Sequence, residues 1–239
     1  MSGAKGRFRA VLFDIDGTLV HAGGAGRRSV ERALEAHLGH AVRPQESWLG
    51  ELKLDGMTDR LIVREAMIAL GLEFDERRCD AILDSYVTAL GREIHGDGYE
   101  VLPGVEPVLE ALHADRRLVG LCTGNVARGA RIKLGRGGVD RFFEWDDGAP
   151  NGFAEDGEAR ERIVAAVLRR AATRLDQLAP SQVVVVGDTP RDVVAAKACG
   201  VPVLAVATGR FRVDELRSLG ADVAVPNLAV PAALEFLLG

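Results

Sequence analysis

The sequence has few cysteines and no long apolar segment. Three cysteines are spread over 239 residues, and this small, odd number favours reduced thiols over a disulfide framework or a zinc site. No apolar run approaches the roughly 18 residues that cross a bilayer. The short basic stretch at residues 1–9 is not followed by the apolar segment of a signal peptide. We therefore expect a soluble, cytoplasmic protein.

The sequence also lacks a strong excess of either charge. Thirty basic and 35 acidic residues give a net charge of −5, so there is no electrostatic reason to expect nucleic acid or an anionic membrane as a partner. Hydrophobic residues make up 47% and charged residues 27% of the chain, which is ordinary for a globular protein with a buried core.

Strands and helices alternate in the C-terminal part of the sequence. The continuous β-branched run at residues 183–186 predicts a central strand that is buried on both faces. Repeated alternation indicates an α/β fold: a Rossmann-like parallel sheet core with helices on both faces. The predicted strands are 9–13, 118–122, 142–145, 183–186, 203–206 and 222–225. The predicted helices are 106–114, 125–134, 158–175, 192–199, 213–219 and 230–237.

Residues 22–98 differ, because apolar residues recur there at helical spacing and no strong strand interrupts them. Helices are predicted at 27–38, from about Thr58, and at 76–90, with Thr58 or Asp59 capping the second. This pattern predicts a helical insert at 22–98, joined by two hinges to a core made of 1–21 and 99–239.

Two carboxylates end the first predicted strand. Asp14 and Asp16 point to the same side of the chain because side chains alternate along a strand. One can act as a nucleophile and the other as a proton donor if their surroundings separate their pKa values. Gly17 suits a tight turn that brings backbone amides to a phosphate, and Thr18 can brace that turn.

Two further predicted strands end in polar residues. Thr123, Gly124 and Asn125 follow the strand at 118–122 and open a helix, whose N-terminus attracts anions. Asp188 and Asp192 follow the central strand, four residues apart. Parallel strands present their carboxyl ends at one sheet edge. Together with Asp14 and Asp16, these residues predict an acidic, oxygen-only pocket that suits Mg²⁺.

These motifs resemble those of the haloacid dehalogenase-like hydrolase superfamily. The segment 14–18 (Asp-Ile-Asp-Gly-Thr) is similar to its first motif, Thr123 to its second, and the segment 187–192 (Gly-Asp-Thr-Pro-Arg-Asp) to its fourth. The helical insert resembles the family's C1-type cap domain, and the segment 206–209 resembles one frequent in phosphoglycolate phosphatase-like members. The resemblance covers essentially the whole chain.

The resemblance implies a phosphoaspartate mechanism with Mg²⁺. Asp14 would be the nucleophile, and Asp16 would protonate the leaving alcohol and then activate water. The metal ligands would be Asp14, the backbone carbonyl of Asp16, and Asp188, with Asp192 either ligating the metal or orienting its waters.

The remaining implied roles concern the phosphoryl group. Thr123 would act on the transferring phosphoryl oxygens, and Gly17, Thr18, Gly124 and Asn125 would bind substrate.

The sequence departs from the family at the third motif, where most members have a lysine. No lysine lies between Trp145 and Val183. Arg160, at the start of the predicted helix, can supply the same charge through a bidentate fork. Arg162 is the alternative.

Three functions fit this pattern. The leading interpretation is a magnesium-dependent phosphatase for a small phosphorylated metabolite, such as phosphoglycolate or a sugar phosphate. A phosphomutase of the β-phosphoglucomutase type would use the same catalytic residues. A non-catalytic binding protein on the same scaffold is the third, favoured only by the missing lysine. The expected partner is a small-molecule phosphate ester, with no nucleic acid or membrane, and the expected state is a monomer or homodimer.

Overall fold

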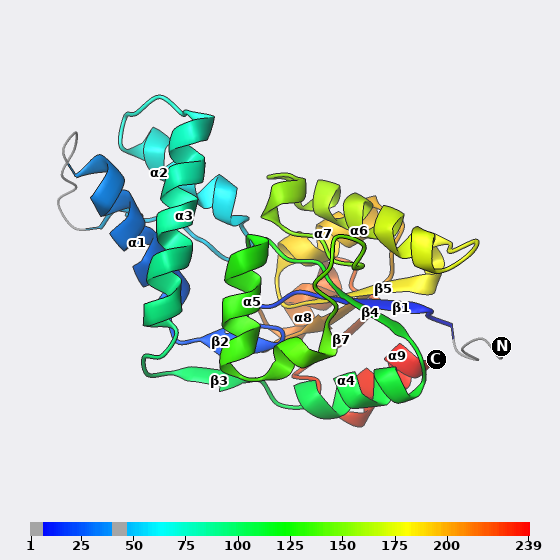
Figure 1. The fold of residues 1–239 in the computed structure, drawn as a ribbon. Helices are drawn as coiled ribbons and strands as arrows, with labels where there is room; N and C mark the ends of the chain where they lie inside the picture. The colour runs from blue at the N-terminus through cyan, green and yellow to red at the C-terminus, as the bar shows by residue number, and fades with distance from the viewer. Residues whose placement is uncertain (1–6, 40–46) are drawn as a thin grey trace.

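The computed structural model describes residues 7–39 and 47–239 of the chain. Its centre is a five-stranded parallel sheet in the order β4-β1-β5-β6-β7 (Figure 1). The strands are β1 (Ala10–Phe13), β4 (Leu118–Leu121), β5 (Val183–Gly187), β6 (Val203–Val206) and β7 (Val223–Val225). In register, Ala10 of β1 lies between Leu118 of β4 and Val183 of β5. The predicted Rossmann-like parallel sheet is confirmed.

Helices cover both faces of this sheet, as its alternating side chains require (Figure 1). Val11 and Phe13 of β1 pack with α4 (Val105–Ala114), α5 (Ala127–Arg136) and α9 (Pro231–Leu238). Ala10 and Leu12 pack on the other face with α6 (Arg160–Arg174), α7 (Pro190–Ala198) and α8 (Val213–Ser218). The central strands are therefore buried on both sides.

Three helices lie beside the carboxyl edge of the sheet: α1 (Ala25–Leu38), α2 (Asp59–Ala69) and α3 (Glu76–Glu93) (Figure 1). Their apolar faces form a separate cluster around Leu34, Met67 and Tyr86. Thr58 caps α2 as predicted, because its hydroxyl accepts the Leu61 N–H at 3.2 Å. The division into core and cap domains stays a prediction. Residues 1–6 of the predicted core and residues 40–46 of the predicted insert lie outside the described part of the chain.

One strand pair was not predicted from the sequence. Strand β2 (Val20–Ala22) and strand β3 (Tyr99–Val101) pair antiparallel at the two ends of the helical insert, where we expected only hinges. Each has three residues, too few for a clear alternating pattern.

The strand predicted at 142–145 is wrong. A 3₁₀ helix, η1 (Val139–Phe142), ends there, and the aromatic residues that suggested a strand pack one by one instead. Phe143 is buried, and the Trp145 indole donates to the carbonyl of Asp140 at 3.0 Å.

Two further 3₁₀ turns are η2 (Ala154–Asp156) and η3 (Pro180–Gln182). Within the described residues, no helix is both long and apolar enough to cross a bilayer.

Candidate active site

The carboxyl ends of three neighbouring strands bring the predicted site residues together. Asp14 follows β1, Thr123 follows β4 and Asp188 follows β5. The sheet's hydrogen bonds continue to this edge: the Asp14 N–H donates to Val186 at 2.9 Å, and the Cys122 N–H donates to Phe13 at 2.8 Å. A cavity of about 520 Å³ opens above them, between the sheet edge and the helices α1–α3. Its volume is that of a small-molecule site.

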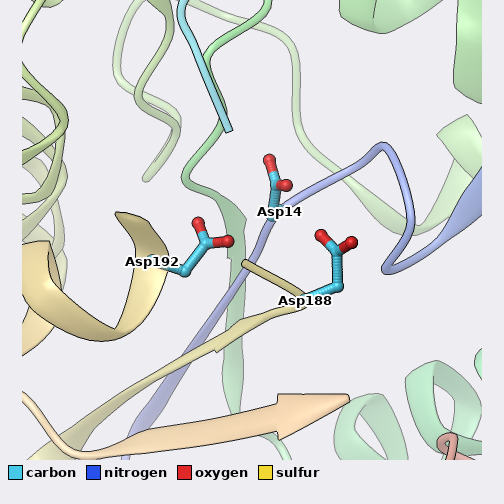
Figure 2. Close-up of side chains that lie close together, drawn as sticks. All are labelled: Asp14, Asp188 and Asp192. Carbon is cyan, nitrogen blue, oxygen red and sulfur yellow. The ribbon is translucent and has the colours of Figure 1, made fainter. Parts of the chain in front are cut away.

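Three buried carboxylates meet at this edge (Figure 2). Asp14, Asp188 and Asp192 each offer an oxygen, and these oxygens all lie within 4.8 Å of one another. Burial, opposed by the guanidinium of Arg160, raises the pKa of Asp14 to about 6. Burial together with the neighbouring carboxylates Asp192 and Asp14 raises the pKa of Asp188 to about 9. The cluster therefore carries more negative charge than its surroundings stabilise.

Gly17 allows the first strand's loop to turn against this cluster. Its φ of +75° lies in the left-handed region, and a side chain there would collide with the carboxylate of Asp188. The hydroxyl of Thr208, from the segment after β6, donates to the Gly17 carbonyl. The turn is thus held from two sides.

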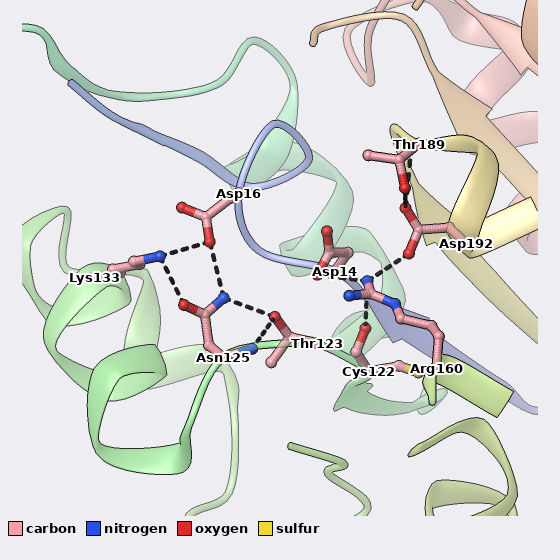
Figure 3. Close-up of polar contacts among 9 residues, drawn as sticks. All are labelled: Asp14, Asp16, Cys122, Thr123, Asn125, Lys133, Arg160, Thr189 and Asp192. Atoms are coloured by element: carbon pink, nitrogen blue, oxygen red, sulfur yellow. Dashed lines mark hydrogen bonds and ion pairs between the residues drawn. The ribbon is translucent and has the colours of Figure 1, made fainter. Parts of the chain in front are cut away.

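Arg160 is the cation nearest to the cluster (Figure 3). Its Nη2 lies 2.8 Å from Asp14 Oδ1, binds Asp192, and donates to the Cys122 carbonyl at 3.3 Å. Arg160 is the first residue of α6 and is 7% exposed, whereas Arg162 is exposed at the surface. Burial would lower the pKa of Arg160, but Asp14 and Asp192 raise it. Of the two arginines, only Arg160 reaches the acidic cluster.

The residues of the cluster fit a divalent cation. Three carboxylates and one guanidinium leave two negative charges, and Asp188 Oδ1 is buried with no hydrogen-bond partner. An oxygen-only donor set suits Mg²⁺. Asp192 has both oxygens engaged, Oδ1 with Arg160 and Oδ2 with the N–H and hydroxyl of Thr189 at 3.0 and 2.7 Å. Asp188 is therefore the carboxylate most in need of a cation.

Asp16 lies on the other side of Asp14 and has different partners (Figure 3). Its Oδ2 accepts from Lys133 Nζ at 2.6 Å and from Asn125 Nδ2 at 2.8 Å. Burial alone would raise the pKa of Asp16, but the ammonium of Lys133 and these hydrogen bonds bring it below its ordinary value. Asp16 is therefore ionised in the resting protein at neutral pH.

The predicted substrate-binding residues are partly engaged with one another. Asn125 Nδ2 also donates to Thr123 Oγ1 at 2.8 Å, and Asn125 Oδ1 accepts from Lys133 at 2.6 Å. Gly17, Gly124 and Asn125 line the cavity. Thr18 does not line it; its side chain is buried and its hydroxyl has no hydrogen-bond partner.

The helical insert contacts the same loops directly. Asp59, at the start of α2, donates its N–H to the Gly124 carbonyl at 2.8 Å, and its Oδ2 accepts the Val126 N–H at 2.8 Å. Burial raises the pKa of Asp59 to about 7. The loop after β4 is thus fixed from the insert as well as from the sheet.

Comparison with known proteins agrees with this geometry. Residues 8–200 match the model of the haloacid dehalogenase-like hydrolases. The chain belongs to this family. It is 31% identical over 218 residues to a phosphoglycolate phosphatase of Rhodospirillum rubrum, covering 89% of this chain and 85% of that protein. It is an enzyme of the same broad kind, a phosphoric monoester hydrolase.

Solved structures share its fold. CbbY of Rhodobacter sphaeroides, determined with phosphate, superposes with a TM-score of 0.72 at 16% identity, covering 95% of this chain and 99% of that one. A Bacteroides vulgatus structure described as a β-phosphoglucomutase gives 0.69 at 18% identity, covering 97% and 90%. At this low identity, the two structural similarities establish the fold alone.

Lys133, Asp59 and Tyr86 line the cavity of this family member, but the sequence analysis did not assign them to the site. For Lys133, the sequence pattern contained one indication of a buried position. It shares the buried face of α5 with Ala130 and Leu134, where a lysine without a partner would be costly. Asp59 was predicted only as a possible cap of α2.

Proposed function

We propose that the protein is a magnesium-dependent phosphatase that hydrolyses a small phosphate ester through an aspartyl phosphate. The observation that carries this proposal is the cluster of Asp14, Asp188 and Asp192, which leaves two negative charges beside a cavity after Arg160 is counted. When bound, Mg²⁺ would be held by Asp14, Asp188 and the Asp16 carbonyl. It would neutralise charge on the transferring phosphoryl group.

In the first half-reaction, a carboxylate oxygen of Asp14 attacks phosphorus, and the bond between phosphorus and the leaving oxygen breaks. Asp16 gives its proton to that oxygen, which leaves as an alcohol. The resting Asp16 is ionised because of Lys133. A dianionic phosphate bound beside it opposes this charge and raises its pKa, so that Asp16 takes up a proton from solvent as the substrate binds.

In the second half-reaction, ionised Asp16 removes a proton from water, and the resulting hydroxide attacks the phosphorus of the aspartyl phosphate. The bond between phosphorus and Asp14 breaks, which releases phosphate and restores Asp14. Arg160 stabilises the charge of Asp14 and of the phosphoryl oxygens. Thr123 and the Gly124 amide bind those oxygens.

The substrate is a small phosphorylated metabolite. The named relative with 31% identity is a phosphoglycolate phosphatase, which makes phosphoglycolate the first candidate. The cavity wall contributed by the insert combines apolar Val30 and Ile62 with Arg27, and Arg210 lines the cavity from the core. This mixture would also accept a sugar phosphate.

The test is phosphate release from phosphoglycolate, sugar monophosphates and an aryl phosphate, with Mg²⁺ and with a chelator. We expect release with Mg²⁺ only, at least about 10³-fold lower in Asp14→Asn. Asp214→Asn, which alters a carboxylate 83% exposed to solvent, is the matched control and should keep full activity. Folded wild-type protein that releases phosphate from none of the esters would contradict the proposal.

A further inference from the structure

Lys133 is a buried lysine whose ammonium is aimed at the candidate site. The residue is 4% exposed, and its Nζ lies 2.6 Å from both Asp16 Oδ2 and Asn125 Oδ1 (Figure 3). A buried charge is costly unless it is paired. The two short contacts supply that pairing, so the position of Lys133 is tied to that of Asp16.

Groups from the loop after β1 and from helices α1, α2 and α3 lie around this ammonium. Lys133 comes from α5. Burial alone would lower the pKa of its ammonium, but Asp16, Tyr86 of α3 and Asp59 raise it. Gly26 of α1 lies close enough that an added side chain would contact Nζ. The ammonium therefore stays charged, and the insert restricts its position.

The two hydrogen bonds that Asp16 accepts from Lys133 and Asn125 involve only one of its two carboxylate oxygens. Lys133 and Asn125 both donate to Oδ2. Oδ2 is thereby fixed, while the side chain of Asp16 lines the cavity and is 45% exposed. The orientation of the carboxylate plane is then set by two donors on one oxygen, so that Oδ1 is the oxygen presented to the leaving group.

We propose that Lys133 is a positioning residue that, together with Asn125, holds the acid–base carboxylate of Asp16 toward the leaving group. This role rests on the proposed function, because it assumes that Asp16 transfers the proton. Lys133 acts through Asp16 and does not bind the phosphoryl group itself. Its short hydrogen bonds run to Asp16 and Asn125, and Arg160 serves the phosphoryl side.

The experiment compares two esters that differ in their need for a proton. Benzyl phosphate releases a poor leaving group that must be protonated, whereas 2,4-dinitrophenyl phosphate releases one that departs without a proton. The ratio kcat/KM reports the first half-reaction, in which the bond between phosphorus and the leaving oxygen breaks. In Lys133→Met we expect kcat/KM with Mg²⁺ to fall about 100-fold for benzyl phosphate and less than about fivefold for the dinitrophenyl ester.

Two comparisons make the test specific. Asp16→Asn should show the same selectivity between the esters, and the double variant should be no worse than Asp16→Asn, because the two residues act as a unit. Arg131→Met removes an exposed positive charge from the same helix and should leave both esters within about twofold of wild type.

Other outcomes would overturn the role of Lys133. Equal losses on both esters, or a rise in KM with unchanged kcat, would indicate a structural or phosphate-binding role. The same criteria apply to Lys133→Gln, which keeps a donor and replaces the methionine variant if the latter fails to fold. Wild-type protein inactive on both esters would overturn the proposed function itself. Selectivity in Asp16→Asn but not in Lys133→Met would overturn only the role of Lys133.

Discussion

Arg160 and Lys133 are buried cations on opposite sides of the candidate site, and each holds a carboxylate that follows β1. Around Arg160, one guanidinium pairs with Asp14 and Asp192, and the third clustered carboxylate, Asp188, has no ion pair with it. Burial and mutual repulsion raise the pKa of Asp188 to about 9. Around Lys133, Asp16 is paired directly, and its pKa falls below the ordinary value although partial burial opposes this shift.

This difference indicates a ligand-binding site on the Arg160 side and a preorganised ion pair on the Lys133 side. Under the proposed function, a cation completes the Arg160 side, so the energetics of this side depend on what binds there. The Lys133 side already has its counter-ion, so its task is to fix geometry. Four changes test this distinction.

The largest effect is expected from Arg160→Ala. This substitution removes the donor that faces both Asp14 and the phosphoryl group, and we expect kcat/KM for phosphate esters to fall about 10²–10³-fold. Arg162→Ala, an exposed arginine two residues later, is the matched control and should stay within about twofold. An inactive Arg162→Ala together with an active Arg160→Ala would contradict the assignment of Arg160.

The resemblance to the family's third motif pointed to Arg160, whereas no motif pointed to Lys133, and part of the reason is physical. The strand ends and the helix after residue 158 follow from local patterns, and parallel topology brings them to one edge. A lysine on a helix is usually solvated, so only its place in the buried stripe of α5 could have indicated a partner.

The errors in the fold have similar causes. The aromatic cluster at 142–145 has high strand propensity, but each ring packs separately and forms no ladder. The pair β2–β3 has two three-residue strands joined across the whole insert. A pairing so short and so distant leaves almost no local signal.

The second expected effect concerns Asp59, a carboxylate on the Lys133 side. Its pKa is raised from 3.8 to about 7, so the unfolded chain loses this proton first as pH rises, and stability falls between about pH 4 and pH 7. Three pKa units correspond to about 4 kcal/mol as an upper bound. Asp59→Asn should therefore be more stable than wild type at pH 8 by up to that amount.

Urea unfolding at pH 5 and pH 8 measures this effect. The advantage of Asp59→Asn should be much smaller at pH 5. It should not change with Mg²⁺, because Asp59 is not among the three clustered carboxylates. An advantage equal at both pH values would mean that Asp59 is not the titrating group.

The third expected effect is stabilisation by Mg²⁺. At about 100 times its Kd, a ligand of the folded state adds about 2.7 kcal/mol, or roughly 5–10 °C in Tm for a chain of this size. Asp188→Asn should abolish this gain. It should also raise the Tm in chelator at pH 8, since it removes the carboxylate whose pKa is raised to about 9. Lys133→Met should keep the Mg²⁺ gain. A Tm gain retained by Asp188→Asn would contradict the proposed metal site.

The smallest effect is expected for a third cation, Arg210. It forms an ion pair with Asp55 at 2.9 Å between the core and the insert, but its side chain is 64% exposed. Solvent screens such pairs, so Arg210→Ala should change the unfolding free energy by less than about 0.5 kcal/mol, measured in urea at low and high salt. A loss above about 1 kcal/mol would contradict this. Arg160, Lys133 and Arg210 carry the same charge, but Arg160 and Lys133 are buried and Arg210 is exposed. The two buried cations should matter more, because burial prevents solvent from replacing a lost partner.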